Sequence, residues 1–158
     1  MEASRVATEA DVPRLIELAT EALAELTPTR GGAIYSRREA RWPPFDDRFA
    51  AEVSSSDHLV VVGTIDGTAI GYGVVALEKL HDGSLLGAIS DLFVDPEARG
   101  VGVGEAMMDQ IVAWCREHGC TGVDALALPG NRATKNFFET FGLVARAIVV
   151  HRSLEPPV

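Results

Sequence analysis

The sequence predicts a single α/β (α+β) domain in which a mixed, mostly antiparallel sheet is flanked by helices. The first observation is a meander of three apolar stretches, divided by Asp66-Gly67 and by His81-Asp82-Gly83: Leu59–Ile65, Ala69–Leu80 and Ser84–Val94. Asp-Gly suits the tight turn of a β-hairpin because both of its central residues adopt positive φ. The second observation is a helical pattern at Gly104–His118, followed by a short apolar stretch at Val123–Leu128. A connection through a helix makes this last strand parallel to the third strand of the meander.

The remaining elements give the order β-α-α-β-β-β-α-β-α-β over residues 1–158. Apolar residues three and four apart predict an amphipathic helix that ends near Thr27-Pro28, with Thr8 or Asp11 as its cap. The other predicted elements are an opening strand, a short helix before the meander, a helix after Pro129-Gly130, and a final strand: Arg5–Ala7, Phe45–Ser54, Asn131–Thr140 and Leu143–Leu154.

The composition predicts a globular protein that binds neither nucleic acid nor membrane. Its net charge is −9, whereas surfaces that bind nucleic acid are basic. The sequence has no apolar run of about 18 residues or more, so no membrane-spanning helix is expected. Residues Met1–Arg5 have no apolar signal region, which predicts a cytoplasmic location. Cys115 and Cys120 are expected to be reduced thiols, and no metal site is predicted.

A glycine-rich loop follows the third strand of the meander and leads directly into a helix. The loop runs from Asp95-Pro96 through Arg99 to three alternating glycines: Gly100, Gly102 and Gly104. Glycines allow a tight turn and leave backbone N–H groups uncovered, and the N-terminus of the next helix is partly positive. The loop therefore predicts an anion site for a phosphate or a pyrophosphate.

Two common phosphate loops do not fit this stretch. The dinucleotide-binding pattern Gly-x-Gly-x-x-Gly would need a glycine at the position of Glu105, and the mononucleotide P-loop would need Lys-Ser or Lys-Thr after Gly104. Both of those folds also open with a parallel strand–helix–strand unit, whereas here an antiparallel meander precedes the loop.

The pattern Arg-x-x-Gly-x-Gly, formed by Arg99, Gly102 and Gly104, resembles the GNAT superfamily of N-acetyltransferases. The resemblance covers nearly the whole chain and includes the opening strand, the meander, and Asn131 through Gly142 (Asn-x-x-x-x-x-Phe-Phe-Glu-x-x-Gly). It implies a GNAT-like fold in which Ser84–Val94 and Val123–Leu128 are parallel and splay apart.

The resemblance implies acetyl-CoA (CoA) as the cofactor. The pyrophosphate would lie on backbone N–H groups of seven consecutive residues: Arg99, Gly100, Val101, Gly102, Val103, Gly104 and Glu105. The pantetheine arm would pair like an extra strand with the backbone of Leu92, Phe93 and Val94. Side chains after Pro129-Gly130 would contact or border the arm: Asn131, Ala133, Thr134, Phe137 and Phe138. The physical argument agrees, because amides and phosphates need backbone hydrogen bonds and a helix N-terminus in line.

Acetyl transfer to an amine also needs an oxyanion stabiliser and a base. The resemblance assigns the first role to the backbone N–H of Val94. Family members often place a glutamate on the central strand as a base that works through water, and the nearest residues here are Ser90 and Asp91. Strict alternation along a strand puts Asp91 on the face of Phe93 and Ser90 on the opposite face with Leu92. Either residue is a candidate for the catalytic role.

Phe138 departs from the family pattern. Family members often have a tyrosine there that protonates the leaving thiolate, and a phenylalanine donates no proton. A general acid contributes roughly 10²–10⁴ in rate, but a thiol with a pKa of about 8.5 still leaves acceptably as a thiolate near neutral pH. A water molecule, Tyr72 or Tyr35 is an alternative donor. The substitution also leaves open a non-catalytic module that binds or senses acyl-CoA.

The acceptor is expected to be a primary amine of a small molecule or a protein, bound near Tyr35 and Tyr72. Residues Thr29–Pro44, called the cover segment below, are either a solvated loop with a short helix or a cover over the acceptor. Their arginines favour an anionic amino acid, whereas the negative net charge favours a cationic amine: Arg30, Arg37, Arg38 and Arg41. The apolar run Ile148-Val149-Val150 in the predicted final strand is consistent with a homodimer.

Overall fold

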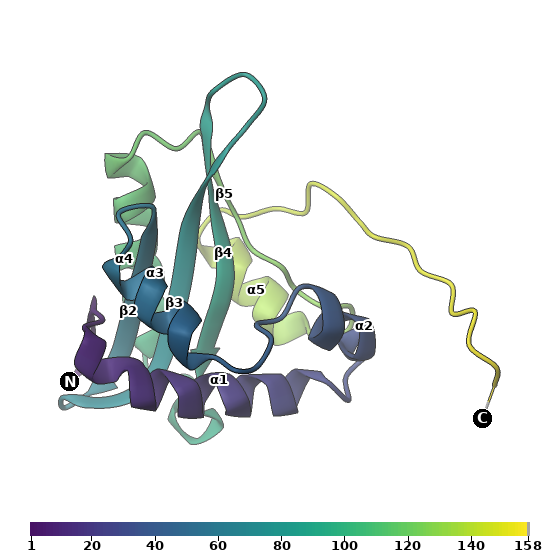
Figure 1. Cartoon of the computed structure of the whole chain (residues 1–158), viewed down its shortest axis with the longest axis horizontal. Coiled ribbons are helices and arrows are strands. Elements are labelled where there is room, and N and C mark those ends of the chain that lie inside the picture. Colours follow the sequence, from purple (N-terminus) through teal and green to yellow (C-terminus); the bar gives the residue numbers. More distant parts are fainter. Residues whose placement is uncertain (158) are drawn as a thin grey trace.

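The computed structural model describes residues 1–157 and contains one five-stranded sheet in the order β1-β2-β3-β4-β5 (Figure 1). The strands are β1 (Glu2–Val6), β2 (His58–Ile65), β3 (Thr68–Lys79), β4 (Leu85–Val94) and β5 (Gly122–Asp124). Neighbouring strands are antiparallel except β4 and β5, which are parallel. The predicted mixed, mostly antiparallel sheet is confirmed.

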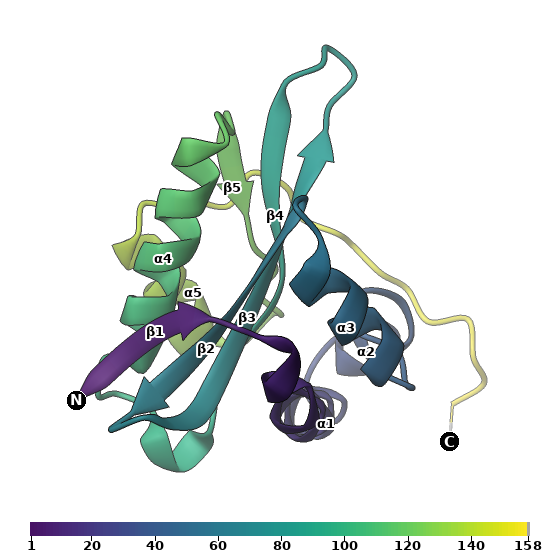
Figure 2. The same ribbon diagram turned by 60° about the vertical axis from the view of Figure 1, so that its left-hand side comes forward.

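Helices cover both faces of this sheet (Figure 2). They are α1 (Val12–Leu26), α2 (Gly32–Arg38), α3 (Asp46–Ser54), α4 (Val103–Glu117) and α5 (Arg132–Thr140), with short 3-10 turns η1 (Glu9–Asp11) and η2 (Pro96–Ala98). Of these helices, α1, α2 and α3 lie on one side, and α4 and α5 lie on the other. None of the helices among residues 1–157 is long and apolar enough to cross a membrane.

Two hydrophobic clusters lie on opposite faces of the sheet, because successive strand residues point to opposite faces. On β2, Val60 and Val62 pack with Leu15 of α1 and Phe49 of α3, while Val61 between them packs against α4. The α4 side is filled by residues one helical turn apart, which explains the periodicity in the sequence: Met107, Ile111 and Cys115.

A β-bulge interrupts the pairing of β3 with β4. Val74 pairs with Asp91 and Val75 pairs with Ile89, so Ser90 is an extra residue on β4. Strict alternation therefore fails at this point, and the expectation that Ser90 shares a face with Leu92, opposite Asp91, is wrong. Instead, the Ser90 hydroxyl donates a hydrogen bond to Asp91 Oδ1.

β5 is shorter than the predicted strand Val123–Leu128. It pairs with β4 only at Leu86–Ala88, and no strand of residues 1–157 pairs with Ile89–Val94 on that side. The two parallel strands thus separate after three pairs, as the resemblance implied. The separation leaves the backbone groups of β4 that face away from β3 without a strand partner along its second half.

The predicted final strand at Leu143–Leu154 is wrong. Residues 143–157 contain no strand, and the chain leads away from the sheet (Figure 1). Ile148 is 84% exposed and Val150 is 89% exposed. An apolar, β-branched run favours a strand only where a neighbouring strand supplies hydrogen bonds and packing, and this run has no such neighbour within residues 1–157.

Candidate functional site

The glycine loop joins the end of β4 to the start of α4. Asp95 Oδ1 accepts a hydrogen bond of 2.9 Å from the backbone N–H of Glu97, which fixes the turn that leaves the strand. Gly100 and Gly102 then have φ values of 83° and 100°, a conformation that side chains rarely adopt. This conformation lets the backbone reverse and enter α4 at Val103.

The N-terminus of α4 has the geometry that suits an anion. Gly102 occupies the cap position, and no side chain of residues 1–157 caps the helix there. The N–H of Ala106 makes the first helical bond, of 3.1 Å, to the carbonyl of Gly102. The N–H groups of Val103, Gly104 and Glu105 precede this bond, so they lack helical partners and point out of the helix start. This set of backbone donors fits a pyrophosphate.

The side chain of Arg99 does not contribute to that set. Its Nη2 lies 2.8 Å from both carboxylate oxygens of Glu25 on α1, and its Nε donates a 2.9 Å hydrogen bond to the carbonyl of Val94. Arg99 therefore braces the loop against α1 and β4. Its backbone N–H remains the part expected to bind an anion.

Helix α5 packs beside the same loop. A Cβ placed on Gly104 would lie 3.1 Å from Phe137 Cε1 and 3.9 Å from Val94 Cγ2, so these three residues meet where β4 ends. Asn131 caps α5, its Oδ1 accepting a 3.3 Å hydrogen bond from the N–H of Thr134. The structure thus gathers the predicted cofactor residues of β4, the loop and α5 along the open edge of β4.

Phe138, at the usual tyrosine position, is 8% exposed. Its ring packs edge-on against Phe137 at a centroid distance of 5.6 Å. The side chain therefore belongs to the apolar packing of α5, and it offers no proton to a leaving group.

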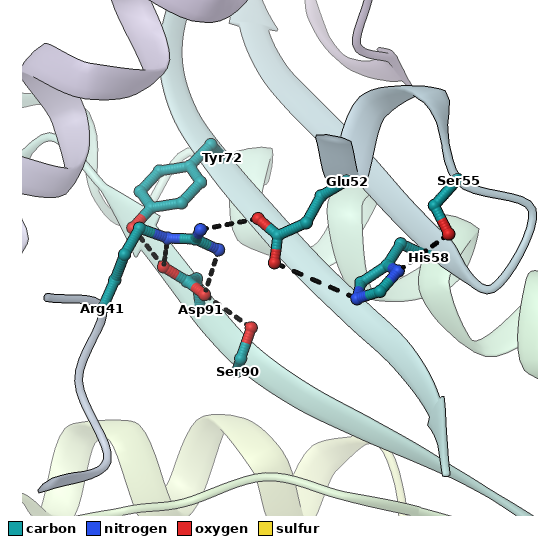
Figure 3. A network of polar contacts seen from close by, with 7 residues as sticks. All are labelled: Arg41, Glu52, Ser55, His58, Tyr72, Ser90 and Asp91. Atoms are coloured by element: carbon teal, nitrogen blue, oxygen red, sulfur yellow. Dashed lines mark hydrogen bonds and ion pairs between the residues drawn. The ribbon is translucent and has the colours of Figure 1, made fainter. Parts of the chain in front are cut away.

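Four donors surround the carboxylate of Asp91 (Figure 3). Arg41 approaches it from the cover segment, with Nε 3.1 Å from Oδ2 and Nη2 3.1 Å from Oδ1. The Tyr72 hydroxyl donates to Oδ2 at 2.7 Å, and the Ser90 hydroxyl donates to Oδ1 at 2.6 Å. The Asp91 side chain is 7% exposed, whereas Ser90 is exposed. Ser90 is thus the solvent-facing member of this group.

Both tyrosines predicted near the acceptor lie close enough to Asp91 for its charge to act on them. Tyr72 is 2% exposed, and its buried ring packs against Phe49. Burial, followed by the charge of Asp91, raises the pKa of Tyr72 well above its ordinary value. Tyr35 on α2 is half-buried, and burial and the Asp91 charge also raise its pKa. Both hydroxyls therefore stay protonated at neutral pH, and Tyr35 is the more accessible of the two.

The outer part of this network was not predicted. Glu52 on α3 accepts a 2.6 Å hydrogen bond from Arg41 Nη1, and its other oxygen lies 4.0 Å from His58 Nε2 (Figure 3). Glu52 falls one helical turn after the buried Phe49, on the face of α3 that packs inward. A charged residue on an apolar helix face was the available signal in the sequence.

Two further features bear on the chemistry of the site. Residues 1–157 contain no group of three or more His, Cys, Asp or Glu side chains that could hold a metal ion. Glu78 and His81 lie at the end of β3 and in the turn after it, and neither takes part in the network around Asp91.

Known proteins resemble the chain in sequence and fold. Residues 17–143 match the model of the acetyltransferase (GNAT) family. The aminoglycoside N(6')-acetyltransferase type 1 of Stenotrophomonas maltophilia is 28% identical over 106 residues, which cover 62% of this chain and 69% of that protein.

Two solved structures extend the comparison to nearly the full length. A variant of the BH1408 protein from Bacillus halodurans has a TM-score of 0.82 and 24% identity, covering 96% of this chain and 99% of the other. Glucosamine-6-phosphate N-acetyltransferase from Arabidopsis thaliana has a TM-score of 0.67 and 25% identity, covering 98% and 99%. From the family match over most of its length, the chain belongs to the acetyltransferase (GNAT) family, and it is an acyltransferase.

Proposed function

We propose that the protein is one N-acetyltransferase domain over residues 1–158, which moves an acetyl group from acetyl-CoA to a primary amine of a small molecule or a protein. The observation that carries this proposal is a continuous path of backbone donors and acceptors. It runs along the open half of β4 and ends at the uncapped N-terminus of α4. The exposed hydroxyl of Ser90 lies beside this path, where β4 leaves β5.

The residues present fit acetyl-CoA as the donor substrate. The backbone N–H groups from Arg99 to Glu105 would bind the pyrophosphate, and Leu92, Phe93 and Val94 would pair with the pantetheine arm. Asn131, Thr134, Phe137 and Phe138 would border the arm from α5. Acetyl-CoA supplies an activated thioester carbonyl, and the chain orients it.

In this proposal, the amine nitrogen attacks the thioester carbon directly, and the bond from carbon to sulfur breaks. The N–H of Val94 stabilises the oxygen as negative charge develops on it. Asp91 already accepts four hydrogen bonds, so Ser90 is the group that meets the amine. The Ser90 hydroxyl donates a hydrogen bond to Asp91, so its oxygen is free to accept a hydrogen bond from the amine. CoA leaves as a thiolate, and the proton that the amine nitrogen loses passes to solvent, from which the thiolate can be protonated.

The charge around Asp91 supports a cationic acceptor. Two carboxylates, Asp91 and Glu52, share a single guanidinium, so the buried group carries an excess negative charge. The guanidinium of Arg41 is already paired with these two carboxylates, so it is not available to an anionic substrate. An amine carrying further positive charges, such as an aminoglycoside or a polyamine, would be attracted to this side of β4, next to Tyr35.

A second candidate function is a module that binds acyl-CoA without catalysis. Phe138 favours it, because the ring at the position of the usual acid is buried and apolar. The two functions predict the same affinity for CoA and differ only in turnover.

Release of free thiol from acetyl-CoA distinguishes them. The wild-type protein would be incubated with neamine, spermidine, glucosamine 6-phosphate or a peptide that begins with alanine, and CoA binding would be measured by calorimetry. We expect CoA binding and stimulation of thiol release by at least one cationic amine. CoA binding without stimulation by any amine would favour the non-catalytic module, and absence of CoA binding would reject both.

The exposed C-terminal segment supports a second copy of the chain as a partner. Its large apolar side chains lie in solvent: Val144, Ile148, Val149, Val150 and Leu154. Apolar surface gathered in this way marks a contact surface in soluble proteins, and each copy would bring the same segment. Light scattering at micromolar concentration tests this homodimer, and a monomeric mass would reject it.

A further inference from the structure

Arg41 differs from the other arginines of the cover segment. Arg30, Arg37 and Arg38 are exposed, whereas the Arg41 side chain is 5% exposed. Arg41 lies in the irregular connection between α2 and α3, so no helix holds it in place. Its side chain instead points toward Asp91 on the sheet (Figure 3).

All three nitrogens of the Arg41 guanidinium donate hydrogen bonds to carboxylates. Nε and Nη2 form a fork with the two oxygens of Asp91, each at 3.1 Å, and Nη1 bonds Glu52 at 2.6 Å. Its Cζ lies 4.0 Å from the centroid of the Phe49 ring. Although burial alone would lower it, the charges and hydrogen bonds of Asp91 and Glu52 raise the pKa of Arg41, so it stays charged.

Stability alone does not account for this arrangement. Removing charges from water costs about as much as their attraction returns, and apolar replacements of buried ion pairs are often equally stable. A forked pair does provide orientation, because the planar guanidinium fixes the plane of the carboxylate. At Asp91, that plane determines where the Ser90 and Tyr72 hydroxyls point.

We propose that Arg41 is a positioning residue for the acyl transfer, a role that rests on the proposed function. It holds Asp91 in one orientation and thereby aims the hydroxyl of Ser90 at the amine. The same side chain ties the cover segment, which includes Tyr35 on α2, to the bulge of β4. The acceptor side of the site is therefore assembled by a single buried guanidinium.

The proposal predicts different effects of losing the fork on the amine and on CoA. The α4 N-terminus and the glycine loop, which would bind CoA, form no hydrogen bond with Arg41, Asp91 or Glu52 among residues 1–157. Loss of the fork should therefore affect the amine and leave the affinity for CoA unchanged. A general loss of structure would affect both.

Arg41→Lys tests this most directly, because lysine keeps the charge but is a single donor point without a fork. Arg116→Lys is the matched control, since Arg116 is exposed in the last turn of α4, outside the cover segment. The measurements are kcat and KM for the best amine of the panel above, KM for acetyl-CoA, and the Kd of CoA by calorimetry.

We expect Arg41→Lys to lower kcat/KM for the amine by about 10²-fold, the usual effect of misplacing a reacting group by about 1 Å. The Kd of CoA should stay within about twofold of wild type, and Arg116→Lys should match wild type in all parameters. Wild-type kcat/KM for the amine in Arg41→Lys would overturn the proposal. An equal loss of CoA affinity would also overturn it.

Glu52→Gln serves if Arg41→Lys does not fold, because it keeps the volume of the side chain but replaces the charged acceptor of Nη1 with a neutral one. This weakens one of the contacts that hold the guanidinium against Asp91. The same selective loss for the amine, smaller in size, supports the proposal, and an unchanged rate overturns it. If the wild type itself transfers no acetyl group, the proposed function fails separately. The tie between the cover segment and β4 is then measured by trypsin cleavage within the segment, after Arg30, Arg37 or Arg38, which Arg41→Met should accelerate severalfold. Unchanged cleavage would overturn this tie.

Discussion

The hydroxyl of Ser90 donates a hydrogen bond of 2.6 Å to Oδ1 of Asp91, the residue that follows it on β4. Consecutive strand residues normally point to opposite faces, and the bulge at Ser90 removes that separation. The result is an exposed hydroxyl in contact with a buried carboxylate that has three other donors. A solvent-facing group is thereby linked to a fixed internal charge.

Ser90→Ala should lower kcat for amine acetylation without changing the fold. The amine nitrogen becomes positively charged as it attacks, and a hydrogen bond to a charged group contributes about 1.5–3 kcal/mol. We therefore expect a loss of roughly ten- to a hundredfold in kcat. The control is Ser54→Ala, an exposed serine at the end of α3 that bonds only Ala50. A wild-type kcat in Ser90→Ala would show that another group meets the amine.

Gly102→Ala should weaken CoA binding. The φ of Gly102 is 100°, and its cap position directs the first N–H groups of α4. A side chain in such a conformation costs on the order of 1–3 kcal/mol, and relief of this strain would turn the donors away. We expect calorimetry to show at least about a tenfold higher Kd for CoA.

Gly83→Ala is the matched control for this strain. Gly83 has a φ of 87° in the turn after β3, with open space around it, so alanine there is strained in the same way. It lies far from the loop, and its Kd for CoA should equal that of wild type. Equal affinities in both variants would mean that the Gly102 conformation does not serve the anion.

Local patterns in the sequence were sufficient for most of the fold. The meander, the Asp66-Gly67 turn and the helices depend on periodicity and turn chemistry, which nearby residues determine. The final strand failed because Ile148-Val149-Val150 has strand propensity but no neighbouring strand in residues 1–157. Pairing is a property of two segments, and one segment does not reveal it.

The part of the site expected to bind CoA was more predictable from the sequence than the network around Asp91. The loop and the α4 N-terminus follow from Arg99, Gly102 and Gly104, because glycines and a helix start are visible in sequence. The network around Asp91 joins three distant segments through the side chains of Arg41 and Glu52. No local pattern links those positions, and the bulge at Ser90 leaves no mark in residue types.

Cys115 and Cys120 should differ in reactivity. Burial raises the pKa of the Cys115 thiol to about 12, and the nearby Cys120 adds to the shift, whereas Cys120 itself is only half-buried. The thiolate is the reactive form, and at pH 8 a thiol of that pKa is ionised to about one part in 10⁴. One thiol should react rapidly with an aromatic disulfide reagent in the native protein, and two in denaturant. Two rapid equivalents in the native protein would contradict the buried position of Cys115.

Phe138→Tyr tests whether the missing acid limits turnover. The ring is 8% exposed, so a new hydroxyl there must find a partner or cost about 1–3 kcal/mol. If the sulfur of bound CoA lies beside this ring, as the family resemblance implies, the hydroxyl is unsatisfied only in the free protein. We therefore expect a Tm lower by roughly 2–10 °C without CoA, recovery of that loss with CoA, and a kcat higher by about tenfold or more at neutral pH. A lower Tm that CoA does not restore, together with an unchanged kcat, would place position 138 away from the sulfur and leave proton donation to water or to Tyr35.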